Sequence, residues 1–240
     1  ATGIVMDVET GAVLAMASSP TYDLNDPSAV YESRLASLVK DGQLDLADAQ
    51  LRQWRNRAIN DTYEPGSTFK VLTMSAALDC GAIDLNTPFH CSGSEQIPGR
   101  AQRLHCWRST GHGAEKTPQA LQNSCNIAFG HIGLRMGGDI FYDYLKAFGI
   151  MEKTGVDLPG EASGLFYERK YLNNPAQYGT SYLITSSFGQ SFRITPMQLV
   201  RSVAAIVNGG YVLEPYIVSE VLDADGNMVE RNEKTVLRQA

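Results

Sequence analysis

The sequence lacks the features that mark several large classes of protein. It has no cluster of basic residues, no internal repeat, no low-complexity tract and no secretory signal peptide. No apolar run approaches the roughly 18 residues that indicate a transmembrane helix. Because nucleic-acid binding needs a basic surface, a nucleic-acid partner is not expected. We therefore expect these 240 residues to be soluble.

The composition is that of an ordinary globular protein. Hydrophobic residues make up 43% of the chain and charged residues 19%, with a formal net charge of −6. These values favour a folded chain with a hydrophobic core. The length admits one large domain, or one domain with insertions.

The most informative segment is Glu-Pro-Gly-Ser-Thr-Phe-Lys at residues 64–70. Pro65 and Gly66 interrupt the chain just before Ser67, and an apolar helical run follows Lys70. In a helix that begins near Ser67, residues Ser67 and Lys70 lie one turn apart on the same face. The amine can then take the proton of the hydroxyl, which is otherwise a poor nucleophile. The alternative is that Ser67 is only a helix N-cap.

The same Ser-x-x-Lys spacing occurs at Ser37 and Lys40. No turn signal precedes this second pair, which lies within a polar helical pattern. We interpret it as a solvated helix face without a chemical role.

A second candidate segment is Ser-Cys-Asn at residues 124–126. Thr117 is predicted to cap a short helix that ends near Ser124, and a new apolar helix follows until Gly137. Polar groups at such a junction can face a cleft. There Ser124 would pass a proton to a leaving group, and Asn126 would hold a substrate carbonyl. The alternative is that both are capping or turn residues.

Residues 63–70 resemble the active-site segment of class B penicillin-binding proteins, the peptidoglycan D,D-transpeptidases, and residues 124–126 resemble their second motif. Cys-Trp at residues 106–107 and Gly-His-Gly at residues 111–113 resemble segments of the division and sporulation members of the family from Gram-positive bacteria. The resemblance covers nearly the whole chain, in the order of the family. Its further segments are residues 6–17, 154–161, 188–190 and 195–199.

The resemblance implies a mechanism without a cofactor. Ser67 attacks the carbonyl between the two terminal D-alanines of a peptidoglycan stem peptide, with Lys70 as the base. Ser124 relays the proton, and Asn126 orients the peptide. The pKa of a free lysine is near 10.4, so a neutral Lys70 needs a shift of about three units. A desolvated pocket and hydrogen bonds to Ser124 and Asn126 are expected to supply it.

The resemblance also implies partners and a location. A second stem peptide resolves the acyl-enzyme, and β-lactam antibiotics stall at that stage. The family is held on the outer face of the bacterial cytoplasmic membrane by an N-terminal anchor, with partners from cell-wall synthesis. We therefore expect an anchor outside residues 1–240.

The third family motif, Lys-Thr-Gly, lies on a strand beside the nucleophile and supplies an oxyanion-hole N–H and a cation. The triplet at residues 153–155 lies before the other landmarks, inside a loop, and we assign it no catalytic role. The resemblance places the true motif beyond Ala240. Because one lost oxyanion donor costs about 3 kcal/mol, we expect residues 1–240 alone to be inactive or nearly so.

The implied fold is α/β, the β-lactamase-like penicillin-binding transpeptidase fold, with a sheet backed by helices. It would be incomplete here, because its C-terminal strands would follow Ala240. Uncovered sheet edges and apolar faces favour self-association. Residues 1–240 divide into an opening hairpin at 2–17, a helical region with the nucleophile at 28–80, an insert at 81–116, and helices and loops at 117–240.

Cysteine is scarce, with four residues. Cys80 and Cys125 are predicted to be packed inside. Cys91 and Cys106 flank a turn-rich segment that indicates a hairpin, so a disulfide between them is one possibility. A zinc site is the other, and it would use Cys91, His105, Cys106 and His112. The C-x₂₋₄-C spacing of structural zinc is missing, so the sequence predicts no metal site.

Two other functions share the Ser67–Lys70 pattern. A serine β-lactamase or β-lactam sensor would need a deacylation device or a sensor partner, neither of which the sequence identifies. A non-catalytic scaffold of the cell-wall machinery is the second alternative. Measurable turnover of penicillin would separate the β-lactamase from the transpeptidase.

Overall fold

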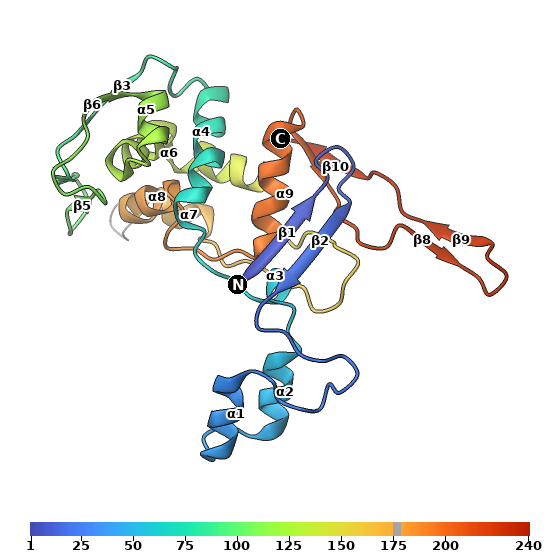
Figure 1. The fold of residues 1–240 in the computed structure, drawn as a ribbon. Coiled ribbons are helices and arrows are strands. Elements are labelled where there is room, and N and C mark those ends of the chain that lie inside the picture. Colours follow the sequence, from blue (N-terminus) through green and yellow to red (C-terminus); the bar gives the residue numbers. More distant parts are fainter. Residues whose placement is uncertain (175–178) are drawn as a thin grey trace.

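The computed structural model describes residues 1–174 and 179–240. The chain opens with the predicted hairpin, formed by β1 (Thr2–Met6) and β2 (Val13–Ser18), which pair antiparallel with Ile4 opposite Met16. Asp7 shapes the turn, because its Oδ1 accepts hydrogen bonds from the backbone N–H groups of Glu9 and Thr10 at 2.8 and 3.1 Å. The hairpin lies beside helix α9 (Pro196–Val207) (Figure 1).

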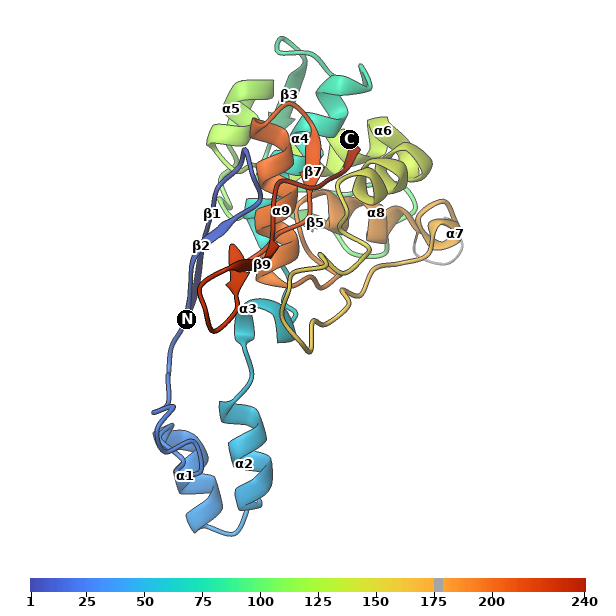
Figure 2. The same ribbon diagram turned by 90° about the vertical axis from the view of Figure 1, so that its right-hand side faces the viewer.

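The polar helical region forms an arm that stands away from the body of the molecule. It consists of α1 (Ser33–Lys40) and α2 (Leu46–Gln53), and α3 (Arg57–Asn60) leads the chain back (Figures 1 and 2). Ser37 and Lys40 are both exposed on α1. The second Ser-x-x-Lys pair therefore lies on a solvated helix face, as predicted.

The helix after Ser67 is the centre of the hydrophobic core. It begins as a short 3₁₀ helix, η1 (Gly66–Phe69), and continues as α4 (Lys70–Asp79). Leu72, Ala76 and Ala77 of α4 are buried in the same hydrophobic core as side chains of α6 (Asn126–Ala147) and α8 (Gly179–Ser187). Burial of each large apolar side chain stabilises the fold by roughly 1.5–3 kcal/mol, which fixes α4 firmly.

The start of the helix at residue 117 and the end of the helix predicted to stop at Gly137 both differ from the prediction. Thr117 does not cap α5 (Thr117–Gln122), because the N-cap is Lys116, whose backbone N–H is bound by the side chain of Gln119 at 2.7 Å. Thr117 instead donates its hydroxyl to the Asp84 carbonyl at 2.6 Å, which ties α5 to the preceding loop. The predicted stop at Gly137 is a break inside α6, where this residue has φ 74° and ψ 161°.

The insert is built from two small strand pairs. β3 (Pro88–Cys91) pairs with β6 (Gly113–Lys116), and β4 (Ser94–Glu95) pairs with β5 (Leu104–His105). The hairpin predicted between Cys91 and Cys106 is thus confirmed as the β4–β5 pair.

The C-terminal part carries the remaining elements. Thr195 caps α9 in a capping box with Gln198, and the turn at residues 223–227 joins β8 to β9. Within residues 1–174 and 179–240, no helix combines the length and apolar character needed to cross a bilayer. The elements are α7 (Arg169–Leu172), β7 (Tyr211–Leu213), β8 (Glu220–Leu222), β9 (Met228–Arg231) and β10 (Val236–Gln239), with β10 paired to β7.

Candidate active site

The turn from η1 into α4 places a hydroxyl and an amine side by side. Ser67 is exposed within η1, whereas Lys70 begins α4 and is 1% exposed. The Lys70 Nζ lies 3.3 Å from Ser67 Oγ. The side chain of Ser67 caps neither η1 nor α4, whose N-cap is Phe69. Ser67 is therefore not a helix N-cap, which was the alternative to its role as a nucleophile.

The second segment completes the surroundings of the amine. Lys70 Nζ donates to the Ser124 carbonyl at 2.8 Å, to Ser124 Oγ at 2.9 Å and to Asn126 Oδ1 at 2.8 Å. The structure thus brings together all four side chains that the sequence singled out. They come from η1, from α4 and from the junction between α5 and α6.

Burial of Lys70 favours the uncharged amine, whereas the hydrogen-bond acceptors and ring faces around Nζ would stabilise an ammonium. Its neighbours are neutral hydrogen-bond acceptors and the rings of Phe129 and Phe188, whose centroids lie 5.3 and 6.0 Å from Nζ. Lys70 takes part in none of the ion pairs found among residues 1–174 and 179–240. Burial lowers the pKa of Lys70 from 10.5 to about 8. About a tenth of the amine is then neutral at pH 7.

The α5–α6 junction holds Ser124 in an unusual backbone conformation. Its φ is 50°, in the left-handed region that non-glycine residues adopt rarely. Two backbone hydrogen bonds hold it there, from Ser124 N to the Leu121 carbonyl and from Cys125 N to the Ala120 carbonyl, both 3.0 Å. The N-cap of α6 is Cys125, so Ser124 is not a cap. Strain of this kind is typical of functional sites.

Residues 189–191 fix the position of Ser67 through hydrogen bonds to the residues that precede it. Gly66 N donates to the Gly189 carbonyl at 2.8 Å, and Ser191 N donates to Glu64 Oε1 at 2.9 Å. Gly189 has φ 83°, and a Cβ built on it would lie 2.0 Å from the Gly66 carbonyl oxygen. Only glycine fits this crossing. Gly189 lies in the family-like segment 188–190, for which no role was predicted.

The Lys-Thr-Gly triplet at residues 153–155 belongs to a structural loop. Thr154 is buried, and its backbone N–H and hydroxyl both donate to Glu161 Oε1, at 2.7 and 2.6 Å. The guanidinium of Arg201 donates to the Thr154 carbonyl at 3.2 Å. These bonds occupy the polar groups of Thr154 inside the loop.

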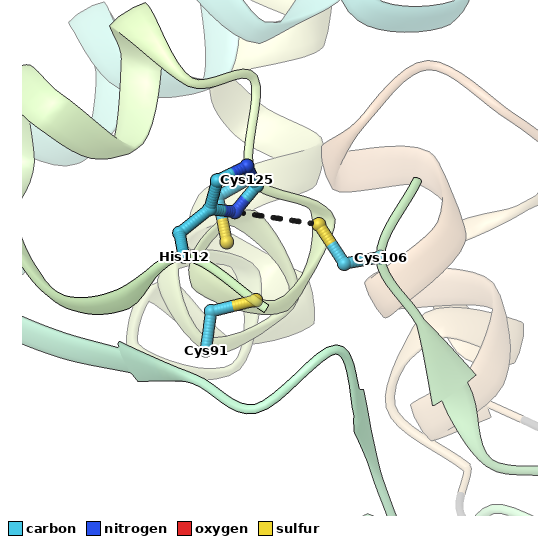
Figure 3. A group of neighbouring side chains, drawn as sticks. All are labelled: Cys91, Cys106, His112 and Cys125. Atoms are coloured by element: carbon cyan, nitrogen blue, oxygen red, sulfur yellow. Dashed lines mark hydrogen bonds between the residues drawn. The ribbon is translucent and has the colours of Figure 1, made fainter. Parts of the chain in front are cut away.

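The cysteines form no disulfide, and the residues gathered around them differ from the zinc set that was the alternative to it. All four are free thiols. The ligand atoms of Cys91, Cys106, His112 and Cys125 lie within 4.8 Å of one another (Figure 3). His105 is not part of this group, and its carbonyl accepts a hydrogen bond from Asn126 Nδ2 at 3.4 Å. Among the described residues, these four could hold a metal ion.

Comparisons with known proteins agree with this geometry. The family model described as the penicillin binding protein transpeptidase domain matches residues 1–239. Stage V sporulation protein D of Bacillus subtilis is 35% identical over 221 residues, which cover 92% of this chain and 30% of that protein. The chain thus spans about a third of the length of this curated relative.

Two solved structures share the fold. The D,D-transpeptidase domain of a peptidoglycan glycosyltransferase from Eggerthella lenta is 26% identical, with a TM-score of 0.81 that covers 98% of this chain and 56% of that one. Penicillin-binding protein A of M. tuberculosis, solved as an imipenem acyl-enzyme complex, is 26% identical, with a TM-score of 0.75 over 99% and 53%. This chain therefore belongs to the penicillin-binding protein transpeptidase family.

Proposed function

We propose that this protein is a serine D,D-transpeptidase that cross-links peptidoglycan stem peptides through an acyl-enzyme on Ser67. The observation that carries the proposal is the exposed Ser67 hydroxyl lying 3.3 Å from a buried amine that pairs with no carboxylate of the described residues. Such an amine is a base with a hydroxyl in reach.

Each group then has a defined step. Neutral Lys70 takes the Ser67 proton while Oγ bonds to the carbonyl carbon between the two terminal D-alanines. Ser124, 2.9 Å from Nζ, gives its proton to the departing amine and regains one from the Lys70 ammonium. The peptide bond breaks, D-alanine leaves, and Ser67 holds the acyl group as an ester. Asn126 orients the peptide. The amine of a second stem then attacks the ester and restores the Ser67 hydroxyl.

The same ester explains inhibition by β-lactams. Ring opening places the acyl group on Ser67, and the amine that would otherwise leave stays attached. Relatives described as acyl-enzyme complexes support this step for the family. Peptidoglycan on the outer face of the bacterial membrane, and the proteins that build it, are the proposed substrate and partners.

A pH profile tests the role of Lys70. Because burial lowers its pKa to about 8, the fraction of neutral amine rises about tenfold per pH unit below that value and levels off above it. The rate of covalent labelling by a fluorescent penicillin should follow this curve, with a midpoint near 8. A labelling rate that is flat between pH 6 and pH 9 would exclude Lys70 as the base.

Product analysis tests the function itself. The full-length protein is incubated with a pentapeptide stem and an amine acceptor, and released D-alanine and cross-linked product are measured. A separate reaction measures hydrolysed penicillin over many turnovers. We expect D-alanine release with cross-linking, and no more than about one penicillin consumed per protein. Rapid, repeated hydrolysis of penicillin would instead identify a β-lactamase, and the absence of both reactions would identify a scaffold.

A further inference from the structure

Three thiols and an imidazole converge beside the catalytic lysine, from four separate segments of the insert and of α6. Cys91 ends β3, Cys106 follows β5, His112 precedes β6, and Cys125 caps α6. Figure 3 shows the three sulfurs and the His112 ring pointing toward one another. We propose that Cys91, Cys106, His112 and Cys125 bind one zinc ion, and that this ion holds the Ser124–Asn126 segment in position for acylation.

The distances fit a tetrahedral ion. Zinc–sulfur bonds of about 2.3 Å place tetrahedral ligand atoms about 3.7 Å apart. All four ligand atoms lie within 4.8 Å of one another, and His112 Nδ1 lies 3.7 Å from Cys106 Sγ. Small side-chain rotations close the remaining difference. Three sulfurs and one imidazole nitrogen are a ligand set of structural zinc sites.

The backbone is built to bring these loops together. Cys106 N donates to the Gly93 carbonyl at 2.9 Å. A Cβ on Gly93 would lie 1.9 Å from the Ser109 carbonyl oxygen, and one on Gly111 would lie 2.1 Å from the Cys91 carbonyl oxygen. Both glycines also have positive φ, so a side chain is excluded at two points where the loops cross. Hydrophobic packing of thiols does not require such close crossings.

The environment also suits metal ligands. Cys91, Cys106 and Cys125 are buried. On binding, each thiol releases its proton and donates a sulfur lone pair to the ion.

The proposed metal site and the active site are joined through the backbone. Cys125 lies between Ser124 and Asn126, the two residues that bind the Lys70 amine. An ion that holds Cys125 to Cys91 and Cys106 therefore fixes the start of α6 against the insert. Without the ion, the strained φ of Ser124 loses a support. This consequence rests on the proposed acylation by Ser67, whereas the metal site itself does not.

Metal content of the wild-type full-length protein is the first test, since it needs no variant. Protein purified under reducing conditions should contain one zinc per chain by elemental analysis and by native mass spectrometry. Replacement with Co²⁺ should give the thiolate charge-transfer and intense visible bands of a tetrahedral site. Protein without zinc that also shows no cobalt bands would overturn the proposal. A disulfide between Cys91 and Cys106 that persists in protein purified under reducing conditions would also overturn the proposal.

Matched variants test the ligands and the link to catalysis. Cys91→Ser and His112→Ala should lower zinc content and slow penicillin labelling by about tenfold or more. Cys80→Ser is the control, because this free thiol lies outside the cluster and its Sγ binds the Ala77 carbonyl. It should keep both zinc and labelling. Zinc loss with unchanged labelling would refute the link but not the site. If the wild-type protein contains zinc but penicillin does not label it, the proposed function is refuted and the metal site is not.

Discussion

Lys70→Ala is expected to slow covalent labelling of the full-length protein by penicillin by about 10²–10⁴-fold, the usual contribution of a general base. The substitution removes the amine that lies 3.3 Å from Ser67 Oγ, and no other amine is bound to that hydroxyl among the described residues. The labelling rate is measured with a fluorescent penicillin at saturating concentration, at pH 8.

Lys40→Ala is the matched control for this experiment. Lys40 has the same Ser-x-x-Lys spacing, but it lies exposed on α1. Its replacement should leave the labelling rate unchanged. Circular dichroism and thermal unfolding establish that Lys70→Ala folds. A folded Lys70→Ala variant that is labelled within a few fold of the wild-type rate would mean that another group removes the Ser67 proton.

Gly189→Ala is expected to slow labelling by about 10²-fold or more, although residue 189 takes no part in the reaction. The new Cβ would lie 2.0 Å from the Gly66 carbonyl oxygen, and the alanine would have to adopt φ 83°. The segment before Ser67 must move to relieve this clash. A displacement of about 1 Å at a reacting group can cost 10²-fold in rate.

Gly209→Ala separates the clash from the backbone strain. Gly209 has φ 88°, nearly that of Gly189, but a Cβ there would come no closer than 3.7 Å to another atom. Both variants should lose some stability, by roughly 1 kcal/mol or more in thermal unfolding. Only Gly189→Ala should lose labelling. Equal labelling by the two variants would show that Gly189 does not position Ser67.

The parts of the site that follow from local geometry could be predicted from the sequence. Ser67 and Lys70 are three residues apart after a Pro-Gly turn, so helix geometry alone brings them into contact. Ser124 and Asn126 lie on a separate segment. Their approach to Lys70 was predicted from the resemblance to a family rather than from spacing.

The parts that depend on distant segments could not be predicted. The four metal-binding candidates are separated by 14, 5 and 12 intervening residues, and this pattern matches no compact zinc motif. The pairing of β3 with β6 is what brings Cys91 to His112, and the start of α6 brings Cys125. Thr117 is a residue type that commonly caps helices, but its hydroxyl donates to the Asp84 carbonyl instead. In each case the partner lies far along the chain.

The most direct measurement of the central claim is the site of the penicillin adduct. The full-length protein is treated with benzylpenicillin, its intact mass is measured, and the modified peptide is sequenced by tandem mass spectrometry. We predict a single adduct on Ser67 that is absent from Ser67→Ala and present in Ser37→Ala. An adduct on Ser124 or any other residue, or no adduct on a folded protein, would contradict the proposal that Ser67 is the nucleophile.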